Sequence, residues 1–83
     1  MMAASTSFDM DKTFTTREEL GRCIKEMRIS KGISVRGMAE LCEMSPATVQ
    51  NIEKGAFSPR LDIVQKILEQ LDARMTITMK EGD

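Results

Sequence analysis

Residues 46–54, PATVQNIEK, combine small, amide and basic side chains at a spacing that could recognise a nucleic acid. If this stretch is helical, the positions i, i+3, i+4 and i+7 place four of its side chains on one face, namely Ala47, Gln50, Asn51 and Lys54. The amide of Gln or Asn can pair bidentately with the N6/N7 edge of adenine, and a small apolar residue can touch a thymine methyl. On an arbitrary helix such a face is more often simply solvated, so its meaning depends on the elements around it.

The net charge of the whole chain neither favours nor excludes nucleic-acid binding, because 12 basic and 13 acidic residues give −1. The distribution of charge along the sequence is more informative. Between residues 20 and 60 the balance is instead +3: the basic residues are Arg22, Lys25, Arg28, Lys31, Arg36, Lys54 and Arg60, against Glu26, Glu40, Glu43 and Glu53. A basic middle between acidic ends is compatible with a surface that faces phosphates. Each of these charges taken alone is more simply a solvated side chain.

Other chemistries have little support in the sequence. The chain has no His, and Cys23 and Cys42 lie too far apart for a short-spaced metal pair, so we interpret both as packing residues. Without a base to activate a thiol or a Gly-rich phosphate loop, we expect no enzymatic activity and no cofactor. The longest apolar runs are far shorter than the roughly 20 residues of a membrane span, and the N-terminus lacks the features of a signal peptide. We therefore expect a cytoplasmic protein that does not bind membranes.

The elements that would position residues 46–54 are helices. A first helix over about 16–30 is predicted from the capping-box spacing of Thr16 and Glu19, in which Glu19 would reach back to the Thr16 amide, and Gly32 suits its C-terminal end. Ser45 followed by Pro46 is an N-cap and first-turn pair, since Pro lacks the amide that a first turn leaves unpaired. This pair starts a helix over about 46–54, which Gly55 closes.

Two further helices and a strand complete the pattern. Ser34 is a candidate N-cap for a short helix whose buried face would comprise Met38, Ala39, Leu41 and Cys42. A fourth helix has Asp62 in its first turn and an apolar stripe of Leu61, Val64, Ile67, Leu68 and Leu71. The period then changes to two, because Met75, Ile77 and Met79 alternate with polar residues, which is typical of a strand with one apolar face.

The stretch GISVRGMAELCEMSPATVQNIEKG, residues 32–55, resembles the helix-turn-helix of Cro/CI-type (XRE-type) DNA-binding regulators. Met38 and Ala39 stand at the family's Leu-Ala pair, and Ser45, Val49 and Ile52 frame its third helix. The resemblance covers residues 20–72 and is closest to HipB-like antitoxins. It implies a mainly α fold: a four-helix lambda-repressor-like domain with one C-terminal β-strand that pairs between subunits.

The sequence departs from the family pattern at three positions. Val35 stands where a phosphate-contacting Gln is common, and Arg36 can take over that role. Glu43 occupies a turn position that usually carries a left-handed Gly, which implies about 1 kcal/mol of strain or more. Pro46 replaces a polar residue. These departures affect the details of contact and leave the predicted fold unchanged.

The resemblance also implies a set of roles for individual residues. The third helix would lie in the major groove. Base reading is assigned to Pro46, Ala47, Gln50 and Asn51, and phosphate contacts to Arg36, Ser45, Thr48, Lys54 and Arg60. In the family, counterparts of Arg28 and Glu53 form a partly buried ion pair that ties the first helix to the third; the alternative is two independent surface charges.

The predicted organisation is a tail over residues 1–14, a DNA-binding domain over 15–72, and a dimerisation strand and tail over 73–83. A lone strand has nowhere in its own chain to bury Met75, Ile77 and Met79, so we expect it to pair with a second copy. The leading hypothesis is a homodimeric repressor of a palindromic operator in double-stranded DNA. The alternative is an antitoxin of a HipA-HipB-like pair, whose main role is to bind a toxin. A third hypothesis, a pure protein-interaction module, would be favoured by an acidic third helix, which this chain lacks.

Overall fold

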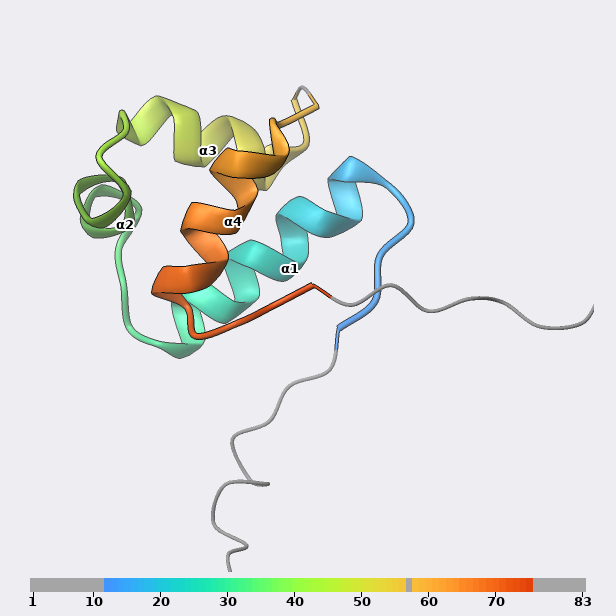
Figure 1. The fold of residues 1–83 in the computed structure, drawn as a ribbon, viewed down its shortest axis with the longest axis horizontal. Helices are drawn as coiled ribbons and strands as arrows, with labels where there is room; N and C mark the ends of the chain where they lie inside the picture. The colour runs from blue at the N-terminus through green and yellow to red at the C-terminus, as the bar shows by residue number, and fades with distance from the viewer. Residues whose placement is uncertain (1–11, 57, 76–83) are drawn as a thin grey trace, which may run out of the picture.

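The fold is an arrangement of four helices, described by a computed structural model for residues 12–56 and 58–75 (Figure 1). Their bounds are α1 Arg17–Ser30, α2 Val35–Cys42, α3 Pro46–Lys54 and α4 Leu61–Gln70. These bounds agree with the four predicted helices, and α3 matches its prediction at both ends. No helix in the described ranges is long and apolar enough to cross a membrane. The predicted strand falls largely outside the described residues, since Ile77 and Met79 lie beyond residue 75.

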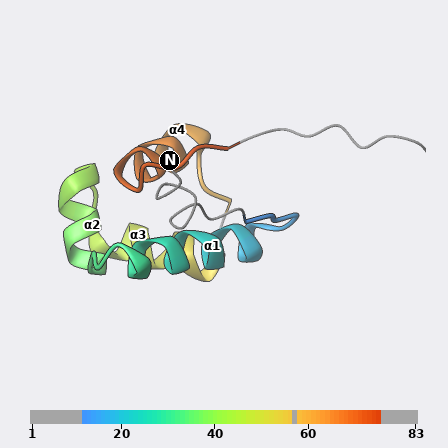
Figure 2. The ribbon, with the colours of Figure 1, turned by 90° about the horizontal axis from the view of Figure 1, so that it is seen from below.

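The helices form two layers joined at one end. Figure 2 shows α1 and α3 together in one layer and α4 in the other, with α2 standing at the side where the layers meet. Accordingly α1 packs against α3, α3 against α2, and α2 against α4. The side of α3 that faces away from the core is therefore supported by contacts of the same helix with α1 and α2.

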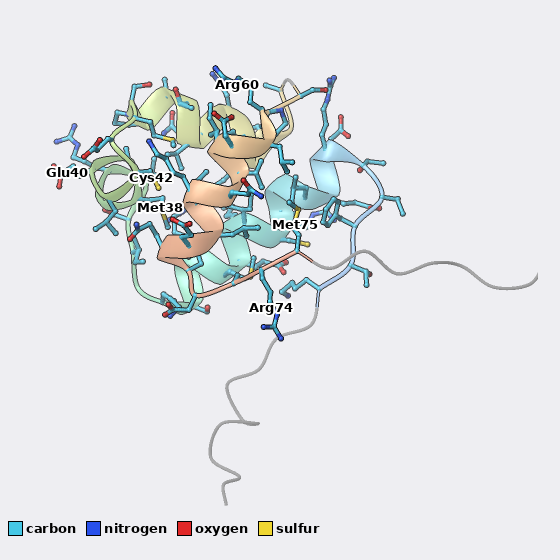
Figure 3. The ribbon with its side chains drawn as sticks, in the orientation of Figure 1. Met38, Glu40, Cys42, Arg60, Arg74 and Met75 are labelled. Atoms are coloured by element: carbon cyan, nitrogen blue, oxygen red, sulfur yellow. The ribbon has the colours of Figure 1, made fainter. Side chains whose placement is uncertain are left out.

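The core lies between the four helices and contains sulfur as well as branched side chains. Its buried members are Ile24, Met38, Ala39, Cys42, Val49, Ile52, Ile67 and Leu71. Figure 3 shows Met38 and Cys42 between α2 and α4, and Cys42 Sγ lies 3.7 Å from Met38 Sδ. Burial raises the pKa of the Cys42 thiol. Both cysteines are free and buried, which agrees with their interpretation as packing residues.

Two residues predicted to be buried are exposed. Leu41 is 51% exposed because, at about 100° per residue, it stands about 160° around α2 from the buried Ala39. Leu61 is 60% exposed although it falls on the apolar stripe of α4. Helical side chains lean toward the N-terminus, and Leu61 is the first residue of α4, so its side chain projects beyond the covered part of the helix.

The C-terminal ends of the four helices share one backbone pattern but not one residue type. A residue of positive φ follows each helix within two positions, and the amide of the residue after it bonds to a carbonyl five positions earlier, as in the bond from Met44 N to Ala39 O at 2.9 Å. Gly32 and Gly55 occupy two of these positions, whereas Glu43 and Asp72 occupy the others. Glu43 has φ 58° and ψ 48°, so the predicted left-handed turn is confirmed.

The predicted capping box of α1 is formed in part. Thr16 Oγ1 accepts a hydrogen bond from the Glu19 amide at 3.1 Å, as expected. The Glu19 carboxylate, however, accepts from the amide of Thr15 at 2.7 Å and from the Thr15 hydroxyl at 3.0 Å, one residue earlier than predicted. These bonds, the Thr15 amide first, hold the pKa of Glu19 below its ordinary value.

Candidate nucleic-acid interface

The outer side of α3 carries the predicted base-reading residues. Val49 and Ile52 are buried against the core, whereas Pro46, Ala47 and Gln50 are exposed. Lys54 is exposed as well, and Asn51 is half-buried. No hydrogen bond within the described part of the chain engages the side-chain amide of Gln50 or Asn51. The polar face of α3 (Ala47, Gln50, Asn51 and Lys54) is therefore available to an external partner.

The start of α3 is fixed by hydroxyl groups that the sequence assigned to phosphate binding. Ser45 Oγ accepts from the Thr48 amide at 3.2 Å, and the Ser45 and Thr48 hydroxyls lie 2.9 Å apart. Pro46 occupies the first turn, where its missing amide costs nothing. The Ser45 hydroxyl thus caps α3 already, and a phosphate oxygen could join the pair of hydroxyls without opening the helix.

The three predicted basic phosphate contacts differ in their surroundings. Arg36 in the first turn of α2 and Lys54 in the last turn of α3 are exposed. Arg60, at the start of α4 in Figure 3, places Nη2 3.0 Å from Asp62 Oδ2, and both side chains are more than 60% exposed. An ion pair so exposed contributes little to stability. Arg60 can therefore exchange this carboxylate for a phosphate at small cost.

Arg28 and Glu53 are brought together by α1 and α3. Arg28 Nε lies 2.6 Å from Glu53 Oε2, and Arg28 Nη2 lies 3.0 Å from Glu53 Oε1, so the contact is bidentate. Their side chains are only 9% and 6% exposed. The remaining guanidinium nitrogen, Nη1, donates to the Ile33 carbonyl at 2.8 Å. Arg28 therefore joins α1, α3 and the loop before α2, and nothing in the sequence indicated its second partner, the Ile33 carbonyl.

A second attachment of α3 to α1 involves glycine and was not predicted. A Cβ on Gly21 would lie 2.3 Å from the Ile52 carbonyl oxygen and 2.5 Å from that of Glu53. A Cβ on Gly55 would lie 2.7 Å from Glu18 Cα, and φ at Gly55 is +71°. The backbones of α1 and the end of α3 thus approach too closely for any other residue. The signal in the sequence was a Gly inside a helix, where Ala is more favourable by about 1 kcal/mol.

A hollow of ≈ 510 Å³ lies away from α3, between the N-terminal segment and α1. Lys12 Nζ and Glu26 Oε1 lie 2.6 Å apart on its wall. Their hydrogen bond is the largest cause of the raised pKa of Lys12 and of the lowered pKa of Glu26. Within the described residues no group of three His, Cys, Asp or Glu side chains could hold a metal ion.

Comparison with known proteins assigns the chain to a family. A family model described as "Helix-turn-helix", HTH_3, matches residues 24–77. The chain belongs to the helix-turn-helix family. This assignment confirms the predicted Cro/CI-type (XRE-type) resemblance and a DNA-binding helix-turn-helix domain. No curated protein matches the chain.

Solved structures resemble the chain over most of its length. The clp gene regulator ClgR from Corynebacterium glutamicum is 28% identical, with a TM-score of 0.66, over 69% of this chain and 61% of the ClgR chain. The restriction-modification controller protein C.AhdI from Aeromonas hydrophila is 26% identical, with a TM-score of 0.67, over 70% of this chain and 84% of its own. A HipA-HipB-O2-O3 complex contains a chain that is 22% identical, with a TM-score of 0.76, over 86% of this chain and 100% of its own. At 22% identity, the similarity to this last chain shows a shared fold.

Proposed function

We propose that this helix-turn-helix protein is a homodimeric transcriptional repressor that reads a palindromic operator with α3 in the major groove. The observation that carries the proposal is the polar face of α3. Within the described residues the side-chain amides of Gln50 and Asn51 make no hydrogen bond, and the helix is fixed on α1 by a buried bidentate ion pair. A preorganised face loses little freedom when it docks, so more of its contact energy appears as affinity. The role is one of binding and needs no catalytic chemistry.

The proposed base contacts come from the exposed part of this face. Gln50, fully outward, is the primary reader and would pair with the N6/N7 edge of an adenine. Asn51 is half-buried, so it would use the outward part of its amide. Pro46 and Ala47 are short and let the helix backbone approach the groove. Because the face has no Arg to grip guanine, we expect half-sites in which A·T pairs are important.

The proposed affinity comes from phosphate contacts around that face. If Arg36, Lys54 and Arg60 of each protomer contact phosphate, a dimer neutralises about six charges, and log K should fall against log salt with a slope of about −5. The hydroxyls of Ser45 and Thr48, at the start of α3, would add uncharged hydrogen bonds to phosphate. Salt-insensitive binding to duplex DNA would contradict these assignments.

The proposed dimer rests on the C-terminal segment. Met75 ends the described part of the chain and is 39% exposed, and the alternation with Ile77 and Met79 supports a strand that pairs antiparallel with its copy. Such a dimer could set the two copies of α3 about 34 Å apart, one turn of DNA. Deleting residues 73–83 should yield a monomer in sedimentation that binds the operator weakly. A truncated protein that stayed dimeric and bound with full affinity would assign the interface to the helices.

A second candidate function, an antitoxin that binds and silences a toxin, is supported by one observation. The fold resembles HipB of the HipA-HipB-O2-O3 complex across the whole HipB chain. In this case DNA binding would be autoregulatory. Co-expression with the products of adjacent genes, followed by co-purification, separates the two: a stoichiometric partner whose toxicity this chain suppresses favours the antitoxin.

The experiment that tests the base-reading assignment is a selection of bound sequences from random duplexes. Gln50→Ala and Asn51→Ala should each reduce operator preference by roughly 1 to 3 kcal/mol and leave thermal unfolding unchanged. Gln65→Ala is the matched control, because Gln65 is an exposed amide on α4. Unchanged sequence preference in both α3 variants would refute the assignment.

A further inference from the structure

A small hollow opens beside the polar face of α3, between that helix, α1 and the start of α2. It has a volume of ≈ 200 Å³ and is lined by Lys25, Arg28, Val35, Gln50, Glu53 and Lys54. Since Gln50 and Lys54 belong to both the hollow and the polar face, a molecule that reaches that face also reaches the hollow. We call it the α1–α3 hollow.

The charge in the α1–α3 hollow is positive and uncompensated. Both oxygens of the Glu53 carboxylate are taken by Arg28, which leaves the ammonium groups of Lys25 and Lys54 as the remaining charges. Five other basic side chains of the described chain form an ion pair with a carboxylate: Lys12, Arg17, Arg28, Lys31 and Arg60. Neither Lys25 nor Lys54 forms one within the described residues. Two cations without an ion pair in this part of the structure, one on α1 and one on α3, favour an anion between them.

The position of Lys25 on α1 explains how it faces this hollow. It follows Gly21 by four residues and precedes Arg28 by three, so the three share one side of the helix. Gly21 meets the backbone of α3 and Arg28 holds Glu53, so this side is the one packed on α3. Lys25 itself is exposed and stands at the rim of that contact.

The size of the hollow restricts the ligand. Pockets that enclose small molecules measure roughly 300 to 1,000 Å³, and the α1–α3 hollow is smaller. It therefore suits a single charged group that belongs to a larger molecule lying across the surface. When a helix lies in the major groove, backbone phosphates run along its flanks, and α1 is the element on this flank of α3.

We propose that the α1–α3 hollow receives one DNA backbone phosphate, held between Lys25 and Lys54, and that Lys25 is a phosphate contact outside the helix-turn-helix itself. This inference rests on the proposed DNA binding. The phosphate beside Gln50 would fix the register of α3 in the groove. Because a phosphate carries no base information, Lys25 would raise the affinity for all DNA sequences alike and leave base preference unchanged.

The test compares Lys25→Gln with Lys66→Gln, an exposed lysine on α4, in the other layer of the fold (Figure 2). Binding to a duplex is measured by fluorescence anisotropy between 50 and 200 mM salt. Because the substitution removes Lys25 from both protomers of the proposed dimer, two phosphate contacts are lost. Binding should therefore weaken about 60-fold at 0.1 M salt, and the magnitude of the salt slope should fall by about 1.8. Lys25→Arg should retain binding, Lys66→Gln should match the wild type, and thermal unfolding should not change.

The outcomes separate this inference from the proposed function. Wild-type protein that binds no duplex would overturn both. Wild-type binding that depends on Gln50, together with an unchanged salt slope in Lys25→Gln, would overturn only the role of Lys25. Amide NMR shifts at Lys25 and Gln50 on titration with duplex support the proposal. The same shifts with sub-millimolar inorganic phosphate, and none with duplex, would identify a site for a free anion and overturn it.

Discussion

Replacing Arg28 by Met should destabilise the protein severely, because Arg28 occupies the junction of α1, α3 and the loop before α2. The substitution leaves the Glu53 carboxylate, 6% exposed, without a cation, and removes the donor to the Ile33 carbonyl. Removing one partner of a buried ion pair costs about 3 to 5 kcal/mol. Domains of this size have a total stability of about 4 to 12 kcal/mol. The variant should therefore lose a large part of its stability.

Thermal unfolding followed by circular dichroism measures this loss. For a domain of this size each kcal/mol shifts Tm by about 4 to 8 °C, so Arg28→Met should lower Tm by about 12 °C or more. Arg22→Met is the control, because Arg22 is exposed on the same helix, and it should change stability by less than about 0.5 kcal/mol.

A double variant shows whether the cost arises from the unpaired charge. Arg28→Met combined with Glu53→Leu removes both charges, and apolar replacement of a whole buried pair is often neutral or stabilising. The double variant should therefore be more stable than Arg28→Met alone. Equal Tm shifts for Arg28→Met and Arg22→Met, or a double variant no more stable than the single one, would refute the reasoning.

Three further predictions concern the packing, a turn and the acid response. Gly21→Ala should lower the free energy of unfolding by about 1 to 3 kcal/mol in urea, because its Cβ meets the Ile52 carbonyl oxygen at 2.3 Å; a more stable variant would contradict the close approach. Glu43→Gly should raise the free energy of unfolding by about 0.5 to 1 kcal/mol, since relief of left-handed strain exceeds the entropy cost of Gly, whereas the helical control Glu40→Gly should lower it. Because the pKa of Glu19 is lowered from 4.5 in the folded state, its contribution is complete above pH 4.5 and is lost as pH falls through the folded pKa. Urea unfolding at pH 6 and pH 3 should thus show a smaller acid loss in Glu19→Gln than in the wild type, and equal losses would exclude this role.

The sequence predicted what depends on local chemistry. The ends of α3 follow from the Ser45-Pro46 pair and from Gly55, because N-caps and left-handed C-terminal residues act within a few positions. The left-handed conformation of Glu43 was indicated by the family resemblance, in which this turn position usually carries a left-handed Gly. The pairing of Arg28 with Glu53 was indicated by family resemblance, since no local pattern connects residues 25 positions apart.

What the sequence did not predict depends on how helices meet. Gly21 reads as a weak helix position until α3 is placed against it, and only then does it become a contact that permits close approach. The exposure of Leu61 depends on its place at the first residue of α4, which periodicity does not record. Lys25 is one basic residue among twelve in the sequence, and its place beside Lys54 requires the packing of α1 on α3.

The polar face of α3 makes no contribution to the core, and this separation has a consequence for how such a protein can change. Val49, Ile52, Glu53 and Gly55 make the packing contacts of α3, whereas Gln50 and its exposed neighbours lie outside the buried core. Exposed substitutions away from packing contacts usually alter stability by no more than about 0.5 kcal/mol. Under the proposed function, specificity and stability would therefore depend on different residues of the same nine-residue helix. If α3 reads DNA as proposed, a lineage or a designer could redirect the protein to another DNA sequence through two or three exchanges, without compensating changes in the core.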